Sequence, residues 1–179
     1  MKEDQGVVIW LTGVPASGKS TIAAAVEEQF HAQSLPVENL DADKVRANLS
    51  PNLGYTAEAR DENTKRLAWM SQMLSQHGIN VIVAAVSPLR SHRDRARQWC
   101  PKFVEVFVDC PLEVCQQRDP QGLYARAARG EVNDIAGMHM PYEAPNAPEV
   151  HCPTHLESVQ DCAQAVIEEL KKLGYLSSL

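Results

Sequence analysis

The feature that most constrains the fold is a glycine-rich segment near the N-terminus, Gly13-Val-Pro-Ala-Ser-Gly-Lys-Ser20. It matches the pattern G-x-x-x-x-G-K-[ST], in which backbone N–H groups curl around phosphate oxygens. A short β-branched apolar run, 7–11, comes directly before it, and apolar residues recur at helical spacing over 21–30. A strand, this loop and a helix in that order form the context in which the pattern binds a nucleotide. The segment therefore predicts a phosphate-binding P-loop in an α/β domain.

Each part of this loop has a chemical task. Gly13 and Gly18 allow a close backbone approach that a Cβ atom would block. Lys19 can bridge the β- and γ-phosphates of ATP as a point charge, and the Ser20 hydroxyl can ligate Mg²⁺. We therefore predict Mg²⁺ as cofactor, Lys19 as a catalytic residue, and an ATP site formed by Gly13, Val14, Pro15, Ala16, Ser17, Gly18, Lys19, Ser20 and Thr21.

Apolar runs alternate with helical patterns along the rest of the chain. This alternation predicts a single P-loop kinase domain over all 179 residues, with a parallel sheet flanked by helices. The stretch from Arg118 to Pro148 is too long for an ordinary connection, and its arginines favour a lid over bound phosphates. We expect strands at 7–11, 37–40, 80–86 and 103–108, and helices from about 19 onward and at 58–76, 91–99, 111–117 and 158–173.

Composition narrows the class of partner. A formal net charge of −6 argues against a nucleic acid or an anionic membrane, because both call for a basic surface. No apolar stretch approaches the roughly 18 residues of a membrane span. The five cysteines are an odd number without a C-x-x-C pair, which favours a reduced compartment over a disulfide framework or a zinc site. We therefore expect a cytoplasmic protein whose substrates are small molecules.

A P-loop can serve a GTPase, a motor ATPase or a small-molecule kinase. The chain has no N-K-x-D motif with which to read guanine. It does have a short second strand that ends in acidic residues, an arginine-rich helix and a basic lid. Such parts suit an enzyme that closes over two substrates and excludes water, which prevents wasteful hydrolysis of ATP. The sequence thus favours a kinase for a small acceptor.

Several separated segments resemble the adenylylsulfate kinase family. Asp41-Ala-Asp-Lys-Val-Arg46 resembles the family's D-G-D-N-[VI]-R, and Ser87-Pro-Leu-Arg90 stands where the family has S-P-Y-R. Leu53-Gly-Tyr55, followed by Arg60-Asp-Glu-Asn-Thr-Lys-Arg66, resembles L-G-F and then R-x-E-N-x-R-R. Residues 104–124 are close to the family consensus, and Pro141-Tyr-Glu-Ala-Pro145 matches P-Y-E-x-P.

The resemblance implies phosphorylation of the ribose 3′-hydroxyl of adenylylsulfate by ATP. It also implies that Arg118 packs over the adenine of ATP, although a charge placed favourably at a helix C-terminus is the alternative. The family forms dimers, which implies a homodimer. The acceptor site that we predict from the resemblance consists of Asp41, Asp43, Arg46, Tyr55, Arg60, Asn63, Ser87, Arg90 and Ile135.

Asp43 is the second residue for which we predict a catalytic role. It follows a predicted strand beside the P-loop, and open α/β sheets bind ligands at the carboxyl ends of their strands. Its carboxylate could ligate Mg²⁺ through water, or it could accept the proton of the acceptor hydroxyl. The alternative is a structural role as the N-cap of a helix.

The lid departs from the family pattern at several positions. Gln121 and Asn133 stand where the family has lysines, and Ile135 stands where it has the phenylalanine that stacks on the acceptor's adenine. His139 and Met140 replace two acids, while Arg126 and Arg129 could supply positive charge from displaced positions. Two alternatives therefore stay open: a kinase for another nucleotide-linked or phosphorylated metabolite, and a non-catalytic nucleotide-binding module.

Overall fold

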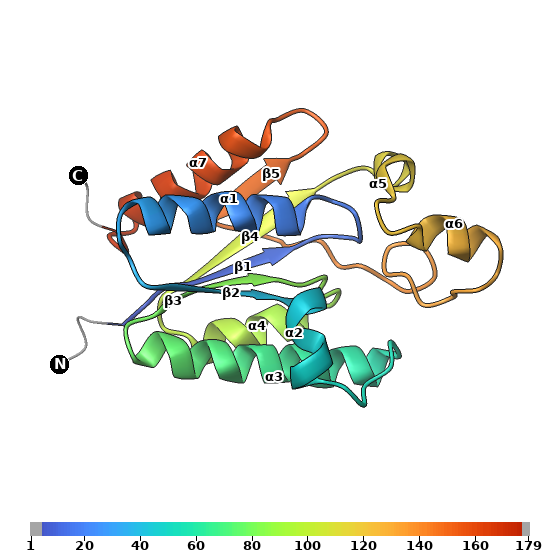
Figure 1. Cartoon of the computed structure of the whole chain (residues 1–179), viewed down its shortest axis with the longest axis horizontal. Coiled ribbons are helices and arrows are strands. Elements are labelled where there is room, and N and C mark those ends of the chain that lie inside the picture. The colour runs from blue at the N-terminus through green and yellow to red at the C-terminus, as the bar shows by residue number, and fades with distance from the viewer. Residues whose placement is uncertain (1–4, 177–179) are drawn as a thin grey trace.

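The computed structural model describes residues 5–176 and shows a parallel sheet between two layers of helices (Figure 1). Within these residues the sheet has five strands in the order β2-β3-β1-β4-β5, and every neighbouring pair is parallel. This arrangement confirms the predicted fold class. The strands are β1 (Val8–Thr12), β2 (Val37–Asp41), β3 (Asn80–Ala84), β4 (Phe103–Asp109) and β5 (Val150–Pro153).

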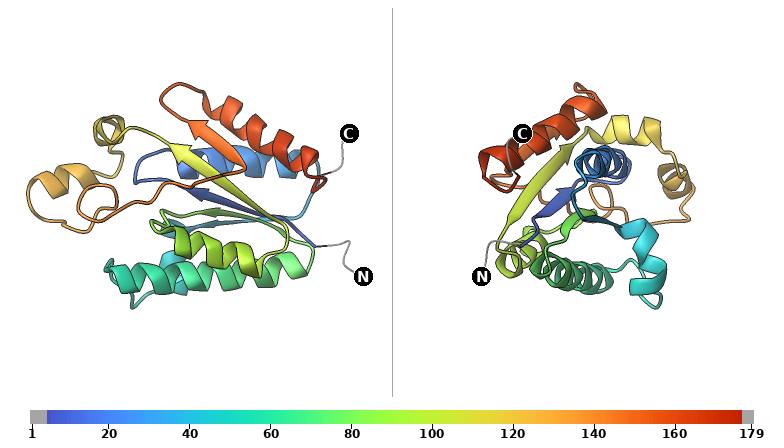
Figure 2. Two further views of the ribbon diagram at one scale, coloured as in Figure 1. Left: turned by 180° about the vertical axis from the view of Figure 1, so that it is seen from behind. Right: turned by 60° about the vertical axis from the view of Figure 1, so that its left-hand side comes forward.

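Helices cover both faces of the sheet, as right-handed βαβ crossovers require. On one face α1 (Lys19–Ala32) packs beside α7 (Val159–Lys172), and on the other α3 (Ala57–Gln76) packs beside α4 (Arg90–Trp99). Figure 2 shows the same two layers from behind. The shorter helices α2 (Ala42–Leu49), α5 (Leu112–Arg118) and α6 (Leu123–Ala128) lie toward the carboxyl ends of the strands.

The central strand β1 is buried on both faces, because a parallel sheet covered by helices leaves no face to solvent. Successive residues alternate between two cores. Ile9 and Leu11 join the cluster beneath α1 and α7, whereas Val8 and Trp10 join the cluster above α3 and α4. The continuous apolar run in the sequence therefore serves two separate cores.

The predicted elements are confirmed, with boundary shifts of a few residues at most. The expected strand at 80–86 ends at Ala84, and the last helix begins after Ser158, whose side chain forms a capping box with Asp161. Three elements were not predicted: α2, α6 and the edge strand β5. All three are short, so their patterns span too few residues to show a period.

Two findings bear on the surroundings of the protein. Among residues 5–176, no helix is both long and apolar enough to cross a membrane. All five cysteines are buried as free thiols, and burial raises the pKa of Cys100 and of Cys115 to about 12. Such thiols are poor nucleophiles near neutral pH, because the thiolate is the reactive form. The cytoplasmic location stays a prediction.

Candidate active site

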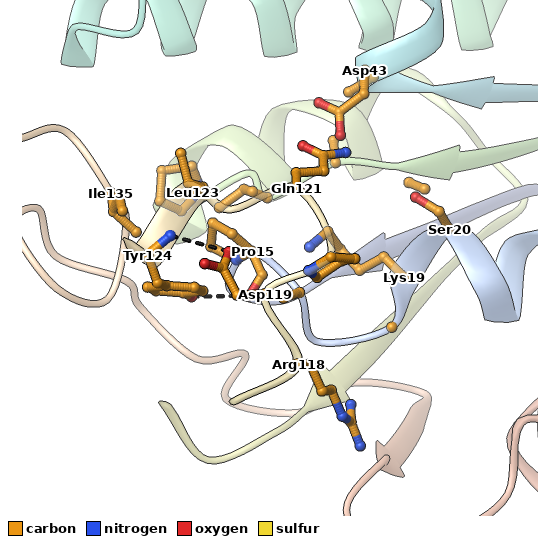
Figure 3. Close-up of a pocket in the computed structure, with 18 of the residues that line it drawn as sticks. Pro15, Lys19, Ser20, Asp43, Arg118, Asp119, Gln121, Leu123, Tyr124 and Ile135 are labelled. Carbon is orange, nitrogen blue, oxygen red and sulfur yellow. Dashed lines mark hydrogen bonds between the residues drawn. The ribbon is translucent and has the colours of Figure 1, made fainter. Parts of the chain in front are cut away.

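A pocket of about 800 Å³ opens at the carboxyl edge of the sheet, between the P-loop, α2, α3 and the lid segment (118–148). Figure 3 shows it in close-up, with Lys19 and Ser20 from the start of α1 and Asp43 from the start of α2. Of the residues predicted from the sequence, those in the pocket lining are Pro15, Ala16, Gly18, Lys19, Ser20, Thr21, Asp43, Arg46, Tyr55, Arg60, Asn63, Ser87, Arg118 and Ile135. The structure does not place Gly13, Val14, Ser17, Asp41 or Arg90 in that lining.

The P-loop has the backbone geometry that its glycines predict. A Cβ atom on Gly13 would lie 2.4 Å from the carbonyl oxygen of Val108, so the loop passes too close to β4 for any side chain there. Gly18 has φ +107° and precedes the first turn of α1, and Ala16 also has a positive φ of +62°. A left-handed conformation at a residue other than glycine is costly and gathers at functional sites. The loop therefore presents the N-terminus of α1, with its positive dipole end, to the pocket.

The Lys19 ammonium lies within the loop. It donates hydrogen bonds to the carbonyl oxygens of Val14, at 2.8 Å, and Gly13, at 3.0 Å. Burial lowers the pKa of Lys19 to about 8, and the nearby Asp43 carboxylate only partly opposes this effect. A desolvated ammonium with a lowered pKa gains most from an anionic partner, which a polyphosphate would supply.

The two acids after β2 have separate roles. Asp41 is only 4% exposed, and its carboxylate caps α2 by accepting the Asp43 N–H at 3.0 Å. The capping role considered for Asp43 therefore belongs to Asp41, which does not line the pocket; that Asp41 binds the acceptor stays a prediction. Asp43 sits in the first turn of α2 with an exposed side chain in the pocket lining (Figure 3).

The donor set in the pocket fits a magnesium ion. Mg²⁺ prefers oxygen ligands and is usually held by one or two protein groups together with substrate phosphates. The Ser20 hydroxyl and the Asp43 carboxylate line the same pocket as Lys19, and both side chains are exposed. These two residues would hold the ion beside the phosphates of ATP.

A second cluster of polar side chains lies on α2 and α3 across the pocket from the P-loop. The guanidinium carbons of Arg46 and Arg60 lie 4.4 and 5.5 Å from the centre of the Tyr55 ring. Arg60 also donates to the carbonyl oxygens of Tyr55, at 3.0 Å, and Asp134, at 2.8 Å, and so connects α3 to the lid segment. Asn63 is buried, and within the described residues its Oδ1 accepts no hydrogen bond. Two cations, an aromatic ring and an amide thus face one space.

Arg90 is another predicted acceptor residue that does not line the pocket. Its side chain is exposed and donates to the carbonyl oxygen of Ala144 at 2.9 Å, outside the pocket lining. The first turn of α4 directs it toward the end of the lid segment. In this structure the Arg90 guanidinium therefore connects two segments of the fold, and an acceptor-binding role for Arg90 stays a prediction.

Arg118 lies at the end of α5, on the other side of the P-loop from α3. Its guanidinium donates to the carbonyl oxygen of Thr154 at 2.6 Å and to the Thr154 hydroxyl at 3.1 Å. Thr154 in turn donates to the carbonyl oxygen of Ser17 at 2.8 Å. Thr154 and Glu157, which follow β5, also line the pocket and were not predicted. No pattern in the sequence pointed to these two residues, because β5 itself was not predicted.

The lid segment touches the P-loop directly. The Tyr124 hydroxyl donates to the carbonyl oxygen of Pro15 at 2.9 Å (Figure 3), and a Cβ atom on Gly137 would lie 2.8 Å from the Val14 side chain. The Asp119 carboxylate accepts the Tyr124 N–H at 3.1 Å and so fixes the first turn of α6. The lid is thus built to lie against the loop that it covers.

The substituted lid positions have distinct surroundings. Ile135 lines the pocket but is only 1% exposed, because it packs in an apolar cluster that joins the lid to α5 and includes Tyr124 and Cys115. Gln121 and Asn133 both line the pocket as uncharged groups. Arg126 lines it as well, 3.6 Å from Glu131, so it is the better placed of the two lid arginines considered above.

The P-loop faces a separate cluster of cations and an aromatic ring, with an acid between them and a lid above. This arrangement defines a P-loop kinase for a small acceptor. Comparisons with known proteins agree. The family model for adenylylsulphate kinase matches residues 5–153. The chain therefore belongs to the adenylylsulfate kinase family, which confirms the resemblance seen in the sequence.

Individual relatives are similar over nearly their full length. The adenylyl-sulfate kinase of Synechococcus sp. (strain JA-3-3Ab) is 45% identical to this chain, and the alignment covers 96% of this chain and 98% of that protein. The adenylyl-sulfate kinase of Gloeothece citriformis (strain PCC 7424) is also 45% identical, with 97% of this chain and 99% of that protein covered. Among solved structures, the Mycobacterium tuberculosis APS kinase CysC in complex with AMPPNP and APS superposes with a TM-score of 0.90 at 37% identity, covering 93% of this chain and 98% of that one.

Proposed function

We propose that this protein transfers the γ-phosphate of ATP to the ribose 3′-hydroxyl of adenylylsulfate. The observation that carries the proposal is one pocket with two differently built ends. The P-loop end offers backbone amides and Lys19, which suit a polyphosphate. The opposite end offers Arg46, Arg60 and Tyr55, which suit a second ligand with both anionic oxygens and a planar ring.

The ATP end explains how the donor would be held. The triphosphate would lie along the loop at residues 13–20, with its γ-phosphate toward the centre of the pocket. The base would lie near Arg118, which is fixed by its two hydrogen bonds to Thr154. A guanidinium held flat in this way offers a face on which a planar base can stack.

The acceptor end explains how adenylylsulfate would be recognised. The guanidinium groups of Arg46 and Arg60 are suited to the paired oxygens of its phosphosulfate. The Tyr55 ring is half exposed and available for stacking with adenine, and the Asn63 amide is available for a polar contact. That position 135 also faces the adenine stays a prediction, since Ile135 is covered by the apolar cluster of the lid.

The chemistry follows from the position of Asp43 between the two ends. Its carboxylate would orient the acceptor 3′-hydroxyl and accept its proton as the oxygen attacks the γ-phosphorus. The bond from that phosphorus to the β,γ-bridging oxygen breaks, and ADP leaves. The Lys19 ammonium and the amides of the P-loop would stabilise negative charge on the transferring group, which is the main catalytic contribution in phosphoryl transfer. The closed lid excludes water as a competing acceptor.

Magnesium belongs to the same proposal. A bound Mg²⁺ would neutralise charge on the β- and γ-phosphates, with the Ser20 hydroxyl as its ligand and the Asp43 carboxylate in contact with it through water. The homodimer and the cytoplasmic location also stay predictions, and sedimentation of the purified protein would measure the first of these.

A panel of acceptors tests the proposed function. ATP consumption by the purified protein with Mg²⁺ should be stimulated by adenylylsulfate, and ³¹P NMR should identify a new 3′-phosphomonoester in the product. AMP is the matched acceptor, because it has the same nucleoside and phosphate without the sulfate, and it should be used much less well. Equal stimulation by AMP, or stimulation only by another phosphorylated metabolite, would identify a different kinase. Tight ATP binding without turnover on any acceptor would indicate a non-catalytic module.

A further inference from the structure

Arg93 on α4 is among the most deeply buried large side chains of the described structure, with 1% of its surface exposed. Its guanidinium donates to three different segments of the fold. Nε donates to the Glu105 carboxylate on β4 at 2.6 Å, one terminal nitrogen to the Ser87 carbonyl oxygen at 2.5 Å, and the other to the Glu143 carbonyl oxygen at 2.6 Å. A guanidinium directs donors from three separate nitrogens, whereas an ammonium has its three N–H donors on one nitrogen and cannot reach three partners spaced in this way.

The first of the two carbonyl partners belongs to the pocket. Ser87 and Pro88 line the pocket, as Asn63 does. Ser87 has φ +42°, a left-handed conformation that costs energy in a residue other than glycine. Its hydroxyl accepts a hydrogen bond from the Trp10 indole at 3.0 Å, and its carbonyl is held by Arg93. The strained turn is therefore fixed from two sides.

The second carbonyl partner belongs to the end of the lid segment. The Glu143 N–H donates to the carbonyl oxygen of Pro88 at 2.7 Å, and the Glu143 carboxylate accepts the Arg90 N–H at 2.8 Å. Residues 141–145 thus lie against the turn at 87–90, and the Arg93 guanidinium bridges the two. One side chain sets the position of the pocket wall relative to the base of the lid.

Stability alone is a poor explanation for this buried charge. Desolvation of an ion pair offsets most of its Coulombic attraction, so apolar residues of similar size are often as stabilising. The neighbouring Arg97 is more exposed and pairs with Glu149 at 2.7 Å and Glu105 at 3.5 Å, but it donates to no residue of the pocket wall. Arg93 differs from Arg97 because it donates to the Ser87 carbonyl of the pocket wall and to the Glu143 carbonyl of the lid segment.

We propose that Arg93 is a positioning residue for the acceptor: without touching either substrate, it holds the Ser87–Pro88 wall and the base of the lid in the register that the acceptor requires. This inference rests on the proposed function. It also implies that ATP binding is insensitive to Arg93, because none of its three hydrogen-bond partners belongs to the P-loop.

The test compares Arg93→Lys with Arg97→Lys. Both keep the charge, but only the first loses the fork that spans Ser87 and Glu143. Arg93→Lys should raise the Michaelis constant for adenylylsulfate on the order of tenfold while the ATP dissociation constant stays within about twofold, because misplaced binding groups weaken the ligand that they contact. Arg97→Lys should leave both constants near those of the parent. Equal effects of the two substitutions, or a parallel rise in both constants, would overturn the proposal.

A second measurement does not depend on the identity of the acceptor. Hydrogen exchange of the backbone should accelerate over 85–90 and 141–145 in Arg93→Lys and not in Arg97→Lys; unchanged exchange there would overturn the positioning role. A parent protein without activity on adenylylsulfate would refute the proposed function and leave this reading intact. Should Arg93→Lys fail to fold, Arg93→Met can be combined with Glu105→Met, so that the Glu105 carboxylate is not left without its Arg93 partner. Hydrogen exchange in this double variant is then compared with that of the parent.

Discussion

The carboxylate of Asp41 accepts a hydrogen bond from the backbone N–H of Asp43 at 3.0 Å. Two acids separated by one residue are thereby assigned to different tasks. Asp41 is buried and is the N-cap of α2, while Asp43 lies in the first turn of that helix and faces the pocket. The cap therefore aims the residue for which we propose the catalytic role.

Asp43→Asn should lower turnover by about a hundredfold or more, because an amide cannot accept the proton of the acceptor hydroxyl. The ATP Michaelis constant should change little. Asp41→Asn is the matched control, since asparagine is as good an N-cap as aspartate and the same negative charge is lost nearby. Steady-state kinetics on both variants measure this difference, and similar turnover in the two would leave Asp43 without a catalytic role.

The affinity for ATP should fall as the pH rises through about 8. Burial lowers the pKa of Lys19 to about 8 in the free protein, and the phosphates of bound ATP favour the ammonium and raise that pKa again. Binding above this pH therefore takes up a proton, and affinity should drop by up to tenfold per pH unit. Calorimetric titrations of the parent and of Lys19→Arg measure this. The guanidinium keeps its charge, so the arginine variant should show no such drop; a parallel drop in both proteins would assign it to another group.

Tyr55→Ala should raise the Michaelis constant for adenylylsulfate about fivefold to a hundredfold, because stacking of a base on an aromatic ring contributes about 1–3 kcal/mol. Stacking acts equally in the ground state and the transition state, so turnover should change little. Tyr55→Phe keeps the ring and should behave as the parent does. A loss shared by both variants would assign the effect to the hydroxyl instead.

Arg60→Met should weaken adenylylsulfate binding by tenfold or more, since a charge-assisted hydrogen bond contributes about 1.5–3 kcal/mol. The side chain also holds the Asp134 carbonyl oxygen of the lid segment, so the loss should extend to turnover. Arg66→Met on the same helix is the control, because Arg66 bonds Glu62 and the Leu49 carbonyl oxygen outside the pocket lining. Acceptor titrations that do not separate the two variants would contradict the role of Arg60.

Much of the fold could be predicted because its signals are local. The P-loop pattern between an apolar run and a helical pattern places β1, the loop and α1 within a residue or two of their observed bounds. α3 and α7 have long periodic stripes, so both were predicted within a residue of their observed bounds. By contrast, β5 has only four residues, and pairing with β4 decides its conformation more than its own composition does.

The candidate site was predictable where residue type alone sets the chemistry. Lys19, Ser20 and Asp43 reach one pocket as expected. Asp41 and Arg90 lie outside the pocket lining, and each side chain has a partner within the fold: Asp41 caps a helix, and Arg90 donates to the Ala144 carbonyl oxygen at the end of the lid segment. Arg93 was not predicted. In the sequence it is one arginine of a basic helix, and only tertiary packing shows that it is buried between three segments.

The hydrogen bond from the Tyr124 hydroxyl to the Pro15 carbonyl oxygen has a consequence for the loop itself. In a trans peptide the C=O and the N–H of the next residue point in opposite directions. A carbonyl drawn outward toward the lid therefore turns the Ala16 N–H inward, into the curve where phosphate oxygens bind. If the lid moved away from the loop, the Pro15 carbonyl would lose this hydrogen bond, and the peptide that it orients would be less constrained. We therefore expect phosphate binding by the loop to depend on the lid, through the hydrogen bond from Tyr124 to Pro15.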